Sequence, residues 1–270
     1  MKNQFQHKGE RGELFHFFAI TFIWTWFLNL PRVLSAFGML TISSMLNAIL
    51  GYTSVFGPMA ASFYLVAKKD GKKGINKIWR RGWNLSFDRK YLLSAILLMP
   101  ANGLLTFLVM GVLNISVPWE YSLPWMLVIP IGLVIWLFGA YPEEFGWRGY
   151  ALPRLIKFQN PLIASLLLGL IWGVWHLPLH FIPSTTQYVI PVWEYILQTM
   201  ALSVMYTWLF QKTNGNLFVA SLFHFSGNLT GALIPYWVSS EGRWISFILL
   251  LIPTVFAGLD ISRSDGYLQE

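Results

Sequence analysis

Ionisable side chains are costly inside a membrane, so those within the apolar stretches of this chain are the first candidates for chemistry. Most acidic residues lie in tails or polar segments, but a few polar side chains fall in three apolar segments of the second half. They are Glu143, Glu144, Arg148, His176, His224 and Asn228. Carboxylates, imidazoles and a carboxamide together are a complete set for activating water on a carbonyl group.

The spacing of the first motif separates its two carboxylates. Glu144 and Arg148 are four residues apart, so on a helix they share one face and can form an ion pair. Neighbouring residues on a helix are about 100° apart, so the pair leaves Glu143 free to face the bundle interior. We therefore expect a structural role for the pair and a chemical role for Glu143.

The other two motifs also have suggestive spacing. His224 and Asn228 are again four residues apart and can point into one cavity. His176 precedes Pro178, and a proline there can distort the helix end beside the imidazole. Each residue alone has an ordinary explanation in helix packing or at the membrane interface. Only their combination favours a catalytic site.

Composition indicates that lipid surrounds this chain. Of its 270 residues, 55% are hydrophobic and only 11% are charged, whereas soluble proteins carry about 25% charged residues. The absence of Cys excludes disulfides, thiolate metal sites and a cysteine nucleophile. Eight stretches are about long enough to span a bilayer. They are residues 14–34, 44–67, 91–113, 124–141, 161–179, 189–210, 217–237 and 244–259.

The positions of the basic residues predict the orientation of the spans. If the N-terminus is cytoplasmic, all but two of the 19 Lys and Arg residues lie on the cytoplasmic side. The exceptions are Arg32 and Arg243. We therefore predict an all-α polytopic protein of about eight transmembrane helices, forming one domain over residues 1–270, with both termini cytoplasmic. The basic segment 68–90 is expected to be a polar loop against anionic headgroups, which accounts for the net charge of +7 without nucleic acid.

Three ordered motifs resemble those of the CAAX protease and bacteriocin-processing family of membrane endopeptidases, which contains the type II prenyl-protein endopeptidases. They are the run Glu143–Leu152 (EEFGWRGYAL), a helix ending x-x-x-His176, and His224-x-x-x-Asn228. The segment Phe56–Ala61 resembles a Gly-Pro stretch of an early family helix. One departure is visible, because Trp172 stands where the second motif usually has Phe. The resemblance covers a core of about residues 142–231.

The resemblance implies a peptidase and a role for each residue. Glu143 would be the base for water, because desolvation in a helix bundle makes a carboxylate a stronger base. His176 would orient or deprotonate the water, and His224 and Asn228 would donate hydrogen bonds to the oxyanion. The Glu144–Arg148 pair would act structurally.

The positions of two of these residues conflict with the predicted span boundaries. Glu143 lies near the cytoplasmic end of its span, whereas His176 lies about 15 residues, or roughly 22 Å, into the next. We expect the fourth helix to continue past Arg148, which would place Glu143 within the inner leaflet.

The sequence leaves the cofactor and the substrate open. Glu143, His176 and His224 are enough ligands for a catalytic zinc, and many relatives are called metalloproteases, but His-Glu-x-x-His is absent and direct glutamate catalysis is the alternative. The chain lacks a Gly-x-Ser-x-Gly motif, and apart from Asp260 near the C-terminal end of the last span the spans contain no aspartate, so serine and aspartyl mechanisms fit worse.

The expected partner is a membrane-associated protein or peptide in the lipid bilayer, with no nucleic acid. We expect a multi-pass protein of a prokaryotic plasma membrane. The alternative functions are a catalytically silent scaffold or immunity-type binding protein, and a small-solute transporter.

Overall fold

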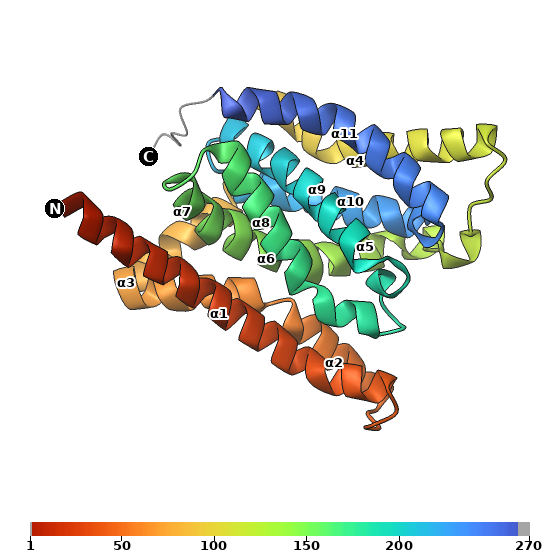
Figure 1. Cartoon of the computed structure of the whole chain (residues 1–270), viewed down its shortest axis with the longest axis horizontal. Coiled ribbons are helices and arrows are strands. Elements are labelled where there is room, and N and C mark those ends of the chain that lie inside the picture. The colour runs from red at the N-terminus through yellow and green to blue at the C-terminus, as the bar shows by residue number, and fades with distance from the viewer. Residues whose placement is uncertain (1, 264–270) are drawn as a thin grey trace.

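The computed structural model describes the backbone of residues 2–263 and the side chains of residues 9–263, and every regular element in this range is helical (Figure 1). The α-helices are α1 (Lys2–Ala36), α2 (Ser44–Ser54), α3 (Gly57–Gly82), α4 (Arg89–Val112), α5 (Val128–Ile135), α6 (Tyr141–Gly146), α7 (Leu152–Ile156), α8 (Pro161–Trp175), α9 (Val192–Lys212), α10 (Leu217–Leu233) and α11 (Ser240–Ser262). The π-helical turns are η3 (Trp136–Ala140) and η4 (Trp147–Ala151). The 3-10 turns are η1 (Trp119–Tyr121), η2 (Trp125–Leu127), η5 (Leu177–Phe181), η6 (Thr186–Val189) and η7 (Tyr236–Val238).

The described part of the chain has the helices of a multi-pass membrane protein. Five helical segments are long and apolar enough to cross a bilayer, and the pair α2 and α3, bent by 46°, can make a sixth. Large apolar side chains such as Val112, Ile129 and Phe256 are exposed, as lipid contact requires. The all-helical membrane fold is therefore confirmed.

The predicted count of eight spans and the orientation of the termini stay predictions. All eight predicted stretches are largely helical, but α9 does not meet the same criteria of length and apolarity, and α10 has only 17 residues. The predicted end of the fourth span at Tyr141 was wrong, because the helical segment runs from Trp119 to Ile156. Its continuation past Arg148, which we expected, is confirmed.

The basic segment 68–90 is mostly helical, so the prediction of a loop was wrong. It forms the second half of α3, which ends at Gly82 and is kinked at Gly71, where φ is 60°. Gly74 and Ile78 are buried on one face, while Lys72 and Lys77 are exposed on the other. The lysines dominate the composition, but the buried face is enough to hold an amphipathic helix against the bundle.

Asparagine caps begin the two helices that carry the histidine motifs. Asn160 precedes α8 and its side chain accepts a hydrogen bond from the Ile163 amide, with Pro161 at the first helical position. Asn216 precedes α10 and accepts from the Val219 amide. These local signals fix where both helices start and therefore the depth at which their histidines lie.

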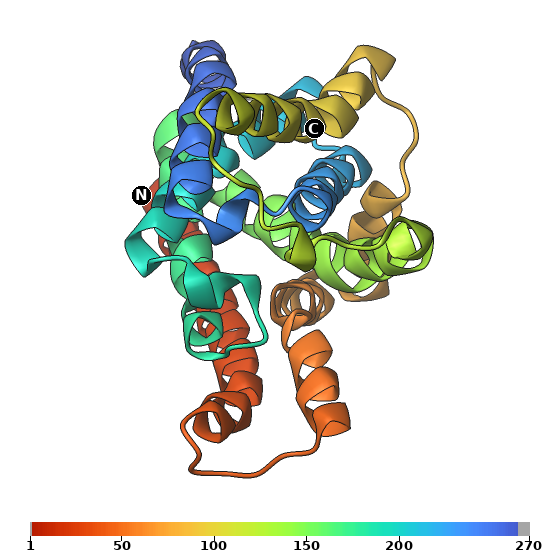
Figure 2. The ribbon, with the colours of Figure 1, turned by 90° about the vertical axis from the view of Figure 1, so that its right-hand side faces the viewer.

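Helix α10 lies in the middle of the bundle. It contacts α4, α9 and the segment from α5 to α6, and Figure 2 shows it nearly end-on with other helices on all sides. Helices α1 and α2 extend together away from this bundle as two arms (Figure 2). Residues of both arms line the candidate site together with residues of the bundle.

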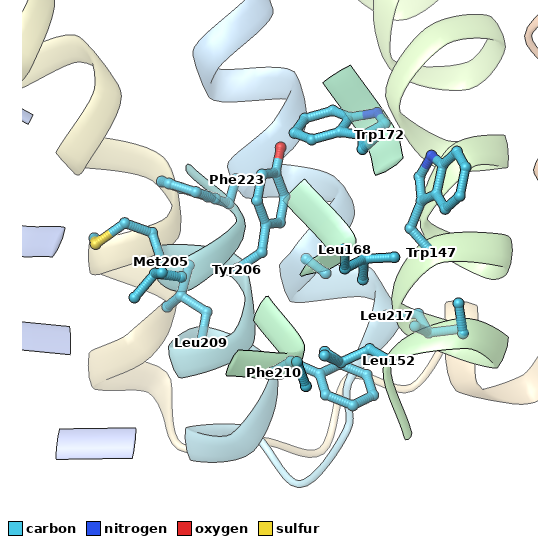
Figure 3. Packing of buried hydrophobic residues seen from close by; sticks show 14 of the residues in the cluster. Trp147, Leu152, Leu168, Trp172, Met205, Tyr206, Leu209, Phe210, Leu217 and Phe223 are labelled. Carbon is cyan, nitrogen blue, oxygen red and sulfur yellow. The ribbon is translucent and has the colours of Figure 1, made fainter. Parts of the chain in front are cut away.

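Close packing of α8 on α9 holds the end of α8 in place. A Cβ at Gly169 would lie 2.5 Å from the Cα of Met200, so only glycine allows this approach. The rings of Trp172, Tyr206 and Phe223 lie in the upper part of the core, and Leu152, Leu217 and the ring of Phe210 lie below them (Figure 3).

Candidate active site

Two π-helical turns flank the short helix that carries the carboxylates. η3 ends at Ala140 and η4 begins at Trp147, so α6 with Glu143 and Glu144 lies between them. Each π-turn inserts an extra residue into the helix and rotates the next turn about the helix axis, and such turns are frequent at functional sites. All six residues of α6 are buried. The segment thus carries both carboxylates into the middle of the bundle.

Two indole rings hold the carboxylate of Glu143. Its Oε2 accepts hydrogen bonds from Trp172 Nε1 at 2.8 Å and from Trp147 Nε1 at 3.3 Å. The side chain is buried, and no described residue donates to Oε1. One oxygen is therefore fixed by the protein while the other remains available to a ligand.

Glu144 joins the first motif to the third. Arg148 NH1 lies 3.0 Å from Oε1 and 3.2 Å from Oε2 of Glu144, so the expected ion pair is confirmed. His224 Nδ1 lies 2.8 Å from the same Oε1. A carboxylate only accepts hydrogen bonds, so Nδ1 carries the proton and Nε2 of His224 is directed elsewhere.

The guanidinium of Arg148 is enclosed by aromatic rings. Its Cζ lies 3.6 Å from the ring centroid of Tyr206 and 4.8 Å from that of Trp172. The side chain is completely buried, and its charge is balanced by Glu144 and by these ring faces. Arg148 therefore contacts Trp172, whose indole also holds Glu143, and links the two carboxylates into one structure.

His176 lies where α8 ends. It caps the helix, and its Nδ1 is 2.8 Å from the carbonyl oxygen of Trp172. A carbonyl oxygen cannot donate, so Nδ1 donates the proton and Nε2 of the neutral ring is an acceptor. The ring of Tyr195, whose centroid lies 5.1 Å away, packs against the imidazole. The 3-10 turn η5, which contains Pro178, follows directly after His176. The helix end is therefore distorted next to the imidazole, as the sequence predicts.

One cavity of about 560 Å³ collects the predicted residues. Glu143, His176, His224 and Asn228 all line it, together with parts of α1, α2 and α9. The side chain of Asn228 is exposed and makes no hydrogen bond with any described residue. Glu144 and Arg148 do not line the cavity and lie behind Glu143 and His224.

The inner-leaflet position of Glu143 stays a prediction, and the structure places the residue far from the ends of its helical segment. The helical segment continues for thirteen residues beyond Glu143 to Ile156, which is about 20 Å of helix. Trp172, which contacts Glu143, lies eleven residues from the start of α8, or about 17 Å. Glu143 and Trp172 therefore lie well away from these ends of the helical segments that carry them.

The residues do not fit the zinc site that the sequence left open. Within the described residues, no three His, Asp or Glu side chains are grouped so that they could hold one metal ion. Glu143, His176 and His224 share the cavity but do not form such a group. Glu143 Oε2 is also already engaged by two indole donors.

The sequence motifs did not predict the side chains that orient the site. Trp147 and Trp172 donate to Glu143, Tyr206 covers Arg148, and Tyr195 packs on His176. The one signal was Trp172, which stands out as a departure from the usual Phe. Phe has no N–H, so this chain has a donor to the candidate base that the usual residue would not provide.

Comparisons with known proteins match the region that builds this site. The family model described as type II CAAX prenyl endopeptidase Rce1-like matches residues 124–230. The chain is 28% identical over 235 residues to CAAX prenyl protease 2 of Methanococcus maripaludis, covering 81% of this chain and 83% of that protein. It is 30% identical over 135 residues to Lysostaphin resistance protein A of Staphylococcus epidermidis, covering 50% of this chain and 32% of that protein.

The matched region runs from before α5 almost to the end of α10 and contains all three motifs. The chain spans about a third of the length of the staphylococcal relative, but most of the archaeal one. These matches confirm the resemblance to the CAAX protease family that the three motifs predict.

Proposed function

We propose that this protein is an intramembrane endopeptidase that hydrolyses a peptide bond of a membrane-associated protein or peptide. The observation that carries the proposal is the cavity that Glu143, His176, His224 and Asn228 line together. The similarity to a CAAX prenyl protease supports the same reaction class. Ionisable side chains inside a membrane protein are costly, so a cavity that several of them line favours chemistry.

Glu143 activates water in the proposed reaction. Its Oε2 is held by Trp172 and Trp147, which leaves Oε1 to accept a proton from water. His176 presents an Nε2 acceptor to the same cavity, because its Nδ1 donates to a backbone carbonyl. The two acceptors can orient one water molecule against the carbonyl carbon of the substrate.

His224 and Asn228 stabilise the tetrahedral oxyanion. The carboxamide of Asn228 has free N–H groups, and His224 can donate from Nε2 when its ring is doubly protonated. In the proposed reaction Glu143 is ionised as the base and Glu144 is paired with Arg148, so a doubly protonated ring at His224 would balance the remaining carboxylate charge of the cluster.

The cavity favours entry from the side opposite the basic residues. It is lined by the second half of α1, by α2, by the end of α8 and by the first half of α9. The exposed Lys69 of α3 pairs with Glu13 in the first half of α1, away from the half that lines the cavity. On the predicted topology the substrate therefore enters from the extracytoplasmic side of a plasma membrane, and a small membrane-associated peptide is the substrate class that fits.

A silent scaffold would bind the same peptides without cutting them. The intact set of four polar residues and the held carboxylate support hydrolysis over binding alone. A transporter is not supported by any further observation.

Membrane peptides from matched strains test the proposal. A deletion strain would express either the wild-type protein or Glu143→Gln, and peptides of the membrane fraction would be compared by mass spectrometry. We expect peptides that are shortened only in the wild-type strain, with their full-length forms accumulating beside Glu143→Gln. Identical peptide sets at equal protein abundance would contradict the peptidase assignment.

A further inference from the structure

Arg32 differs from the other buried arginines in lacking an acidic partner. The structure describes three arginines as buried, namely Arg32, Arg148 and Arg243. Arg148 pairs with Glu144, and Arg243 Nε lies 2.6 Å from Glu194 Oε2. No described carboxylate pairs with Arg32, which is 8% exposed. Burying an unpaired guanidinium in a membrane protein costs free energy, and a bound anion would offset that cost.

Neutral side chains hold the guanidinium of Arg32 in place. NH1 donates to Asn29 Oδ1 at 2.6 Å, and Nε donates to Asn47 Oδ1 at 2.8 Å. Asn29 is itself fixed, because its Nδ2 donates to the Thr25 carbonyl oxygen. A guanidinium has five N–H donors, so these two bonds leave three, including both on NH2. The group is thus oriented and still has donors for a ligand.

Helix α2 leaves room for this group by means of a glycine. A Cβ at Gly51 would lie 3.0 Å from Cζ and 3.1 to 3.2 Å from the two terminal nitrogens of Arg32. Arg32, Asn29 and Gly51 all line the cavity that also holds Glu143. The donors of Arg32 and the candidate base therefore belong to one continuous space.

We propose that Arg32 binds a carboxylate of the peptide substrate and so positions it against Glu143. This inference rests on the proposed peptidase function for the nature of its ligand. The planar fork of an arginine matches a carboxylate with two parallel hydrogen bonds. Among the described residues no other Lys or Arg lines the cavity, and His224 is already paired with Glu144, so Arg32 is also the group that selects for a negative charge there.

The position of Arg32 suits a carboxylate near the cleaved bond. Trp26 Nε1 donates to the carbonyl oxygen of Trp175, next to His176, and so fixes α1 against the end of α8. Arg32 lies six residues further along α1, which is about 9 Å. Two to three extended residues cover about this distance. A carboxylate at the C-terminus of the peptide, two to three residues from the cut, can therefore reach Arg32.

Binding of paired peptides tests this assignment without requiring cleavage. The probes are two fluorescent apolar hexapeptides of one sequence, ending in a free carboxylate or a carboxamide. Both are titrated against protein in nanodiscs of a zwitterionic lipid, in a Glu143→Gln background so that neither is cut. We expect the carboxylate to bind at least about tenfold more tightly than the amide, as a charge-assisted pair implies. Arg32→Gln should reduce this ratio to about one.

Two further variants separate recognition from folding. Arg32→Lys keeps the charge but loses the fork, so the ratio should fall while remaining above one. Gly51→Ala places a methyl group against the guanidinium of Arg32 and displaces it without changing any charge. This variant should also lower the ratio of carboxylate to amide affinity. Thermal unfolding of each variant identifies any that fail to fold. Equal binding of the two peptides by folded protein with Arg32 intact would overturn the proposal. Arg32 would then have only the structural role of holding α2 against α1.

A lipid headgroup is the competing source of an anion. Native mass spectrometry would detect a phospholipid that is retained by the protein and lost in Arg32→Gln. That result, with a peptide ratio near one, would also overturn the proposal. A clear preference for the carboxylate supports Arg32 even if no peptide is ever cleaved, so failure of the peptidase assignment would be recognised separately.

Discussion

Replacing Arg148 with methionine removes the cation that neutralises Glu144 at the centre of the bundle. Both side chains are only 1% exposed, and Arg148 NH1 contacts both oxygens of the carboxylate. Methionine has a similar length and no charge. Arg148→Met therefore leaves Glu144 with His224 as its one remaining partner in the described structure.

The expected loss of stability is large. Breaking a buried ion pair by removing one partner costs about 3–5 kcal/mol, because the other charge remains buried. Loss of the ring contacts with Tyr206 and Trp172 adds to this cost. For a chain of this size, such a change lowers the unfolding temperature by on the order of 10 °C.

Thermal unfolding in detergent, followed by tryptophan fluorescence, measures this loss. The double variant Glu144→Gln/Arg148→Met should recover at least half of it, because residue 144 then carries no uncompensated charge and its amide still accepts from His224. Arg243→Met is the matched control, since Arg243 forms a second buried pair that does not line the cavity. It should lose similar stability while the turnover of the folded fraction stays unchanged.

The outcome distinguishes a pair that holds the site from one that is dispensable. If Arg148→Met unfolds at the same temperature as the wild-type protein, the pair does not hold the site. If the double variant is no more stable than Arg148→Met, the loss comes from packing and the reasoning from charge is refuted.

Three further perturbations probe the topology, the oxyanion site and the packing of α6. A reporter fused after Asp70 should read as cytoplasmic and one fused after Ser184 as external, and a cytoplasmic signal at Ser184 would remove the eight-span topology. Asn228→Ala should leave the unfolding temperature unchanged, because Asn228 bonds to no described residue, but should lower turnover about 10²–10³-fold, as loss of one oxyanion donor does. Unchanged turnover would remove it from the site. Gly146→Ala should destabilise the protein by about 1–3 kcal/mol in chemical unfolding, because its methyl group would collide with Pro58, and an equally stable variant would show that α3 and α6 can move apart.

Short-range spacing predicted much of this site from the sequence. The pair of Glu144 with Arg148 depends only on helical periodicity, and it forms as expected. The presence of His224 and Asn228 in one cavity is explained by the same rule. Local caps and composition likewise predict where most of the helices lie.

Contacts between distant helices could not be predicted in the same way. Trp172 and Glu143 are 29 residues apart in the sequence but share a hydrogen bond. That contact depends on the length of the helical segment through α6 and α7, after which α8 runs back alongside it. The two π-helical turns change the orientation of α6 and have no recognisable signal in the residues. The helix within 68–82 was missed because lysines hide a narrow buried face around Ile78.

The reaction of Glu143→Gln tests the central claim most directly. Glutamine keeps the shape of the side chain and can still accept from Trp172 and Trp147, so the protein should fold and accumulate normally. It cannot take a proton from water. With a peptide that is cut only in wild-type membranes, the purified variant should turn over at least about 10²–10⁴-fold more slowly than the wild-type protein. Equal turnover at equal folded concentration would contradict the assignment of Glu143 as the base and the mechanism built on it.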